Sequence, residues 1–100
     1  MERFRDAMSA AAYAADKLKK TNLFETDRMF CDVYGLLPGQ EQRAHVHAES
    51  DKVYFVLAGT GSFTVDNQTR ALGAGHAVFA PAGCAHAVRN DSDQPLALLV

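Results

Sequence analysis

Apolar side chains recur at intervals of three and four residues along the first part of the chain. The set comprises Phe4, Ala7, Met8, Ala11, Ala12, Ala15 and Leu18. This spacing places them on one stripe of a helix, and the many alanines favour helical backbone. Lys17, Lys19 and Lys20 would then lie near the C-terminal end of the helix, where positive charge is favourable. The pattern predicts an amphipathic helix over residues 1–20 that packs on a sheet or on a second subunit.

After Thr21 the pattern changes to short β-rich segments separated by glycine, proline and asparagine. Segment 52–58, with the sequence KVYFVLA, is β-branched and aromatic and ends at Gly59. The other segments are 23–37, 44–48, 62–65, 69–72, 77–80, 86–89 and 96–100. Short strands with turn residues between them are typical of a sandwich or a barrel. The sequence therefore predicts an all-β domain over residues 21–100.

Composition narrows the class of protein. The 100 residues are 48% hydrophobic and 22% charged, as in a globular domain with one core. A net charge of −2 without a basic stripe predicts no nucleic-acid partner, and no apolar run reaches the ~20 residues of a membrane helix. Two distant cysteines and no signal-like segment predict a cytoplasmic protein with reduced thiols. A domain this small gains stability by self-association, so a homodimer is expected.

Three of the four histidines have a spacing that suggests a common role. His45 and His47 stand two residues apart on a predicted strand, so both side chains leave the same face. His86 begins another predicted strand after a Pro-Gly turn. Imidazole binds zinc, iron, copper and nickel, and three protein ligands leave a position open for substrate. A His-x-His pair alone is equally compatible with a structural or a surface role.

The histidines belong to two longer patterns. The first is Gly39, five further residues and then His45-x-His47. The second pattern is matched at Gly75, Pro81, Gly83, His86 and Asn90. Both patterns resemble the motifs of the cupin superfamily, and together with the strand pattern the likeness extends over residues 30–100. The resemblance implies a single double-stranded β-helix, or jelly-roll, barrel of the small cupin 2 type, preceded by the N-terminal α-helix.

The same resemblance implies a metal site and a small-molecule ligand in the mouth of the barrel. His45, His47 and His86 would hold a divalent transition metal: iron, manganese, nickel, zinc or copper. The implied function is that of a metal-dependent enzyme, dioxygenase-like or isomerase/lyase-like, although no residue stands out as a general base. The alternatives are a non-catalytic metal- or ligand-binding module and a scaffold for dimer formation.

One position departs from the pattern of the family. Lys52 stands where cupins usually carry the glutamate that completes the metal site. A bulge at residues 50–51 would turn Asp51 or Glu49 inward instead. Without such a bulge the site contains only histidines, as in the similar thiol dioxygenases. An inward Lys52 would attract an anionic group of a substrate, whereas an outward Lys52 would only meet solvent.

The remaining candidate residues receive structural interpretations. His76 occupies a turn and is expected to be exposed, and Asn90 is expected to hydrogen-bond the turn after its strand. Cys84 precedes His86 closely enough to line the mouth, although a buried inert thiol is the commoner case. The aromatic residues expected to fill the barrel are Tyr54, Phe55 and Phe79.

Overall fold

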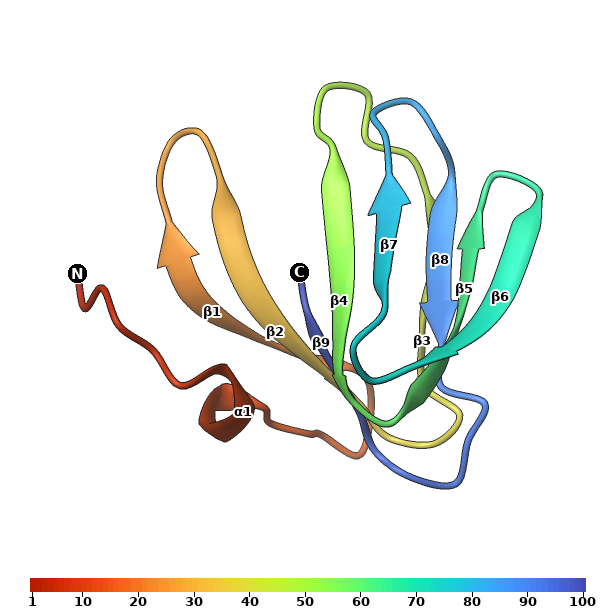
Figure 1. Ribbon diagram of the computed structural model, residues 1–100, viewed down its shortest axis with the longest axis horizontal. Helices are drawn as coiled ribbons and strands as arrows, with labels where there is room; N and C mark the ends of the chain where they lie inside the picture. The colour runs from red at the N-terminus through yellow and green to blue at the C-terminus, as the bar shows by residue number, and fades with distance from the viewer.

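The computed structural model describes residues 1–100 as nine strands and one short helix (Figure 1). The helix is α1 (Ala7–Ala10), and the strands are β1 (Lys19–Glu25), β2 (Phe30–Leu36), β3 (Glu41–His45), β4 (Lys52–Ala58), β5 (Thr60–Val65), β6 (Gln68–Gly73), β7 (Ala77–Ala80), β8 (His86–Arg89) and β9 (Leu96–Leu99). All pairings between strands are antiparallel. The all-β prediction is confirmed, and β4, β7 and β8 have the predicted bounds.

Two sheets face each other and enclose the interior of the barrel. Their strand orders are β1-β2-β9-β4-β7 and β3-β8-β5-β6. The chain crosses repeatedly between the sheets, so that β9 lies between β2 and β4, and β8 between β3 and β5. This is the arrangement of a double-stranded β-helix. The β3–β4 and β7–β8 loops gather at one end, the mouth, and the β2–β3 and β8–β9 loops at the opposite, closed end (top and bottom of Figure 1).

The burial pattern along β4 shows how the sequence fills the barrel. Lys52, Tyr54 and Val56 are buried, whereas Val53 and Phe55 are exposed on the outer face. The hydrophobic core comprises Tyr34, Leu36, Tyr54, Val56, Phe63, Val88, Leu96 and Leu98. Because full burial of one such side chain contributes about 1.5–3 kcal/mol, this cluster is the main source of stability.

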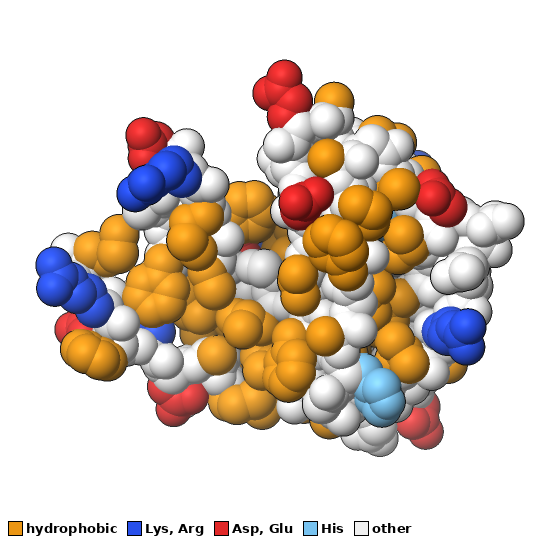
Figure 2. All heavy atoms as spheres, turned by 45° about the horizontal axis from the view of Figure 1, so that its top comes forward, with side chains coloured by type: hydrophobic (Ala, Val, Ile, Leu, Met, Phe, Trp, Pro, Cys, Tyr) orange, Lys and Arg blue, Asp and Glu red, His pale blue; other side chains and the backbone are white.

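The outer face of the five-stranded sheet carries two aromatic residues that were expected inside. Phe55 is 38% exposed and Phe79 is 57% exposed, so Tyr54 alone of the three fills the barrel. The reason is the pleat, which turns Phe55 outward once Tyr54 points inward. Figure 2 shows apolar side chains gathered on this face, around a groove of about 390 Å³ between the β1–β2 hairpin and β4. The homodimer, for which this face offers apolar contacts, stays a prediction.

The N-terminal segment departs most from its prediction. A helix over residues 1–20 was expected, but the chain forms only a four-residue helix, Ala7–Ala10, whose N-cap is Asp6. The backbone is extended at Ala11, and β1 already begins at Lys19. No helix in the structure is long and apolar enough to cross a membrane.

Contacts with the barrel explain why the helix is so short. The carbonyl oxygen of Ala12 lies against Gly35, where a Cβ atom would be only 1.9 Å away from it. Gln40 Nε2 donates a hydrogen bond to the carbonyl of Ala14 at 2.7 Å. A short isolated helix is only marginally stable in water. Long-range contacts of the backbone therefore outweigh the helix propensity of the alanines.

Candidate metal site

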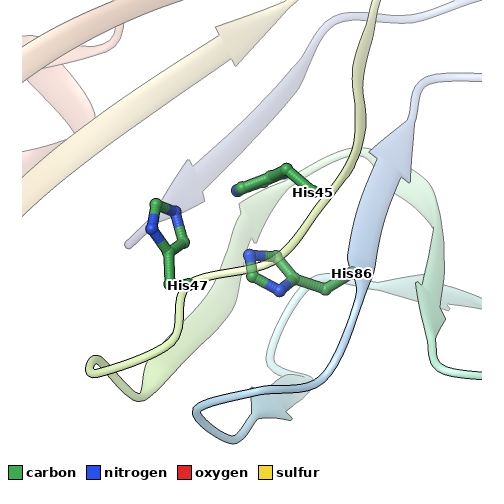
Figure 3. Close-up of side chains that lie close together, drawn as sticks. All are labelled: His45, His47 and His86. Atoms are coloured by element: carbon green, nitrogen blue, oxygen red, sulfur yellow. The ribbon is translucent and has the colours of Figure 1, made fainter.

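The three histidines reach the mouth from neighbouring strands and a loop. His45 ends β3 and His86 begins β8, and the two residues are directly opposite in the ladder between these strands. His47 lies beyond the end of β3, where its carbonyl accepts the N–H of Gly83 at 2.8 Å. The predicted strand over residues 44–48 thus ends early, and a contact with the β7–β8 loop positions His47 instead. Figure 3 shows the three rings around one common space.

The cluster is compact enough to hold one metal ion. The potential ligand atoms of His45, His47 and His86 all lie within 4.8 Å of one another. A metal ion with Zn–N bonds of about 2.0–2.1 Å separates two nitrogens by at most about 4 Å, so small rotations of the rings suffice. His86 is buried, His45 half-buried and His47 exposed, so the site opens to solvent at His47.

Backbone carbonyls orient two of the rings. His45 Nδ1 lies 2.9 Å from the carbonyl oxygen of Arg43, and His86 Nδ1 lies 3.1 Å from that of Cys84. A carbonyl only accepts, so both Nδ1 atoms carry a proton, and in a neutral ring the Nε2 atom then presents a lone pair. His86 Nε2 is buried and has no hydrogen-bond partner. Such an orphaned nitrogen, with its ring held from behind, is what a ligand to a metal requires, and the residues therefore fit a metal ion.

The surroundings also favour neutral imidazoles. The pKa of His86 is lowered, first by desolvation and then by nearby His45, Lys52 and His47. Desolvation likewise lowers the pKa of His47, together with positive neighbours that again include His45 and Lys52. Since neutral imidazole is the form that binds a metal, these rings need not lose a proton at neutral pH.

Lys52 points into the mouth, so the alternative in which it meets only solvent is wrong. Lys52 is only 7% exposed, and its Nζ lies 3.5 Å from Nε2 of His45. The ammonium group also lies over the rings of Tyr34 and Tyr54, at 5.7 and 5.2 Å from their centroids. Desolvation, followed by repulsion from Lys20, lowers its pKa to about 8, so the amine is still largely protonated at neutral pH.

No carboxylate takes the place of the glutamate. The β4–β7 ladder runs without a bulge from Lys52, and Asp51 points away, accepting the N–H of Ala82 at 2.9 Å on Oδ1. Glu49 is exposed and does not belong to the cluster. The alternative in which a bulge turns Asp51 or Glu49 inward is therefore wrong, and the candidate metal ligands are the three histidines alone. Asp51 instead links the two loops that surround the mouth.

A cavity of about 490 Å³ lies beside the histidines and contains residues that the sequence did not single out. His45, His47 and Lys52 line it together with Lys20, Phe30, Tyr34, Gln42 and Arg43. The helical pattern predicts Lys20 at the end of a helix, but the residue lies on β1 directly opposite Tyr34 on β2. The only signal in the sequence for this side of the cavity is the alternation of inward and outward residues along the strand that contains Tyr34.

The other candidates lie outside the site. His76 is exposed, as expected, with Nδ1 bonded to the carbonyl of Gly73 at 2.9 Å. Asn90 is fully buried and hydrogen-bonds the turn after β8, as expected. Cys84 is partly buried but does not line the cavity. A hydrogen bond with Asp66 raises the pKa of the Cys84 thiol.

Two facing sheets with a histidine cluster at one open end define a double-stranded β-helix protein with a candidate metal centre. The family model described as "Cupin domain" matches residues 33–100. The chain belongs to the cupin family, as its two motifs predicted.

Similar proteins support this assignment. The chain is 31% identical over 100 residues to the uncharacterized protein SCO3923 of Streptomyces coelicolor, covering 100% of this chain and 94% of that protein. The crystal structure of TT1209 from Thermus thermophilus is 44% identical, with a TM-score of 0.95 and coverage of 98% and 93%. A predicted oxalate decarboxylase from Thermotoga maritima is 23% identical, with a TM-score of 0.78 and coverage of 82% and 76%. At that identity the likeness shows the fold alone.

Proposed function

We propose that this cupin holds one divalent transition metal ion with His45, His47 and His86 and uses it to bind and transform a small molecule in the mouth. The observation that carries the proposal is the buried Nε2 of His86, which has no hydrogen-bond partner. Leaving a buried polar atom unpaired costs about 1–3 kcal/mol. A metal ion would remove this penalty.

The residues of the site would divide the work. His86 anchors the ion from the interior, and His45 and His47 hold it from β3 and from the open side. The carbonyls of Arg43 and Cys84 keep two of the rings in place. The bound metal would supply Lewis-acid chemistry or, as iron, the binding of dioxygen. The walls of the cavity would limit the size of the substrate, in a dioxygenase-like or isomerase/lyase-like reaction.

Metal content tests this proposal. Protein purified without a histidine tag and loaded in turn with iron, manganese, nickel or zinc is expected to keep one ion per chain. His47→Ala changes an exposed side chain and should lose the ion without loss of folding, as judged by circular dichroism. His76→Ala, the matched exposed histidine outside the site, should keep it. A wild-type protein that retains none of the four metals would contradict the proposal.

A non-catalytic metal- or ligand-binding module is the second candidate, and a specific observation favours it. No carboxylate belongs to the histidine cluster, so the site lacks an evident general base. Oxygen uptake by the iron-loaded protein with a panel of thiols, diketones and catechols separates a dioxygenase from the binding module. Uptake that His47→Ala abolishes supports a dioxygenase, whereas silence across the panel with metal bound leaves the binding module and an isomerase/lyase-like reaction.

A further inference from the structure

The ammonium group of Lys52 is a buried charge without a counter-ion. All ion pairs of the chain involve Arg43 or Arg89, and none includes Lys52. Its surroundings are Nε2 of His45 and the faces of Tyr34 and Tyr54. Buried charges are normally paired because removing one from water is expensive. An unpaired ammonium at the edge of a cavity therefore indicates a site for an anion.

A second amine lies near the same tyrosine ring. Nζ of Lys20 lies 5.1 Å from the centroid of Tyr34, the ring that Lys52 also approaches. Arg43 adds a third cation at the rim, although its Nε is 3.8 Å from the carboxylate of Glu41 and its side chain is 91% exposed. Lys20 and Lys52 are therefore the two cations that a ligand in the cavity would meet.

The cavity also lacks negative charge. None of its lining residues is an aspartate or a glutamate, although the whole chain carries a net charge of −2. Asp32 is the acidic residue that acts on Lys52, but it forms no ion pair with the ammonium group and accepts a hydrogen bond from the amide of Asn22 at 2.7 Å. Positive charge is thus concentrated locally, beside the three histidines.

We propose that the ligand of this site is a small carboxylate, held by Lys52 on one side and by the metal on the other. This inference rests on the proposed metal site for its second half. The ligand would place a carboxylate oxygen beside the three histidines, where the chain itself has no carboxylate. A ligand with a second carboxylate would also place negative charge beside Lys20. Charge-assisted hydrogen bonds of this kind are about twice as strong as neutral ones.

Titration of the metal-free protein tests the first half without a metal. We expect succinate to bind, as measured by calorimetry and by amide NMR shifts around Lys52, and neutral succinamide not to bind. Lys52→Met keeps the length of the side chain and should weaken succinate binding at least tenfold. Lys19→Met removes an exposed lysine next to Lys20 and should leave the affinity for succinate unchanged. Equal binding of succinate to all three proteins, or no binding to the wild type, would overturn the proposal.

Titration with zinc tests the second half. If one carboxylate contacts both Lys52 and the metal, succinate must raise the affinity for zinc by the same factor by which zinc raises the affinity for succinate. We expect a factor of at least ten in the wild type, after correction for zinc bound by free succinate. Lys52→Glu should bind zinc more tightly than the wild type and gain nothing from succinate, since it carries its own carboxylate.

The two titrations separate the failure of each proposal. Zinc binding that succinate leaves unchanged would overturn the carboxylate ligand and leave the metal site standing. Succinate binding that depends on Lys52, in a protein that takes up no metal, would overturn the proposed function and uphold the anion site.

Discussion

The two ends of the barrel are built from the same strands and have opposite character. β4 supplies Val56 to the closed half of the interior and Lys52 to the mouth, and β8 likewise supplies Val88 and His86. The closed half contains the tightly packed apolar core. The mouth contains an imidazole nitrogen without a partner and an ammonium group without a counter-ion.

The treatment of buried polar groups shows what this difference means. At the closed end the amide of Asn90 is completely buried and satisfied by hydrogen bonds at both of its polar atoms. At the mouth, Nε2 of His86 is left free. Because natural proteins pair nearly all buried polar atoms, an exception needs an explanation, and the proposed metal ion supplies one here. One end of the barrel thus stabilises the fold, and the other carries the candidate site.

The largest expected effect is a loss of packing at the closed half. Leu98 is fully buried in the core, so Leu98→Ala should lower the free energy of unfolding by about 4 kcal/mol. Leu99 on the same strand is only partly buried and lines the outer groove, and Leu99→Ala should lower it by clearly less. Urea denaturation followed by circular dichroism measures both, and equal losses would contradict the assignment of the two faces of β9.

Asn90→Ala should have the next largest effect. The side chain donates to the carbonyls of Leu36 at 2.9 Å and Gln94 at 2.8 Å, and accepts from the N–H and hydroxyl of Ser92 at 3.0 and 2.7 Å. Removing it leaves buried partners unsatisfied, at a cost of about 2–3 kcal/mol. Gln94→Ala keeps the carbonyl that Asn90 uses and is the control, with no change expected in the same urea titration. If Asn90→Ala had the same free energy of unfolding as the wild type, the β8–β9 turn would not depend on this amide.

The sequence predicted most of the barrel and the histidine cluster, for identifiable reasons. Strands such as β4 and β7 are bounded by glycine and proline, which are strong local signals. His45, His47 and His86 belong to spaced motifs, so their convergence did not depend on knowing any long-range contact. The extent of the N-terminal helix was missed because contacts with Gly35 and Gln40, far away in the sequence, decide it.

The surroundings of the histidines were less predictable. Val53 and Phe55 are apolar, like the inward residues of β4, so the strand has no polar face that would fix the direction of Lys52. The bond from Ala82 to Asp51 joins two loops that lie 31 residues apart, and it has no local signature. The charge of the cavity emerged only once β1 had placed Lys20 beside Tyr34. Local signals thus identified the candidate ligands, and tertiary contacts determined their neighbours.

The smallest expected effect has the opposite sign. Lys52→Met replaces a buried, unpaired ammonium with an apolar side chain of similar length, and should raise the free energy of unfolding by about 1 kcal/mol at neutral pH. Lys19→Met, at an exposed position, should leave it unchanged in the same urea titration. A lower stability of Lys52→Met would mean that the contacts of the ammonium with Tyr34 and Tyr54 outweigh its desolvation. We expect Lys52→Met to raise the free energy of unfolding and to weaken the binding of succinate. A single substitution at the mouth would then strengthen the fold and impair binding, whereas the substitutions at the closed end only weaken the fold.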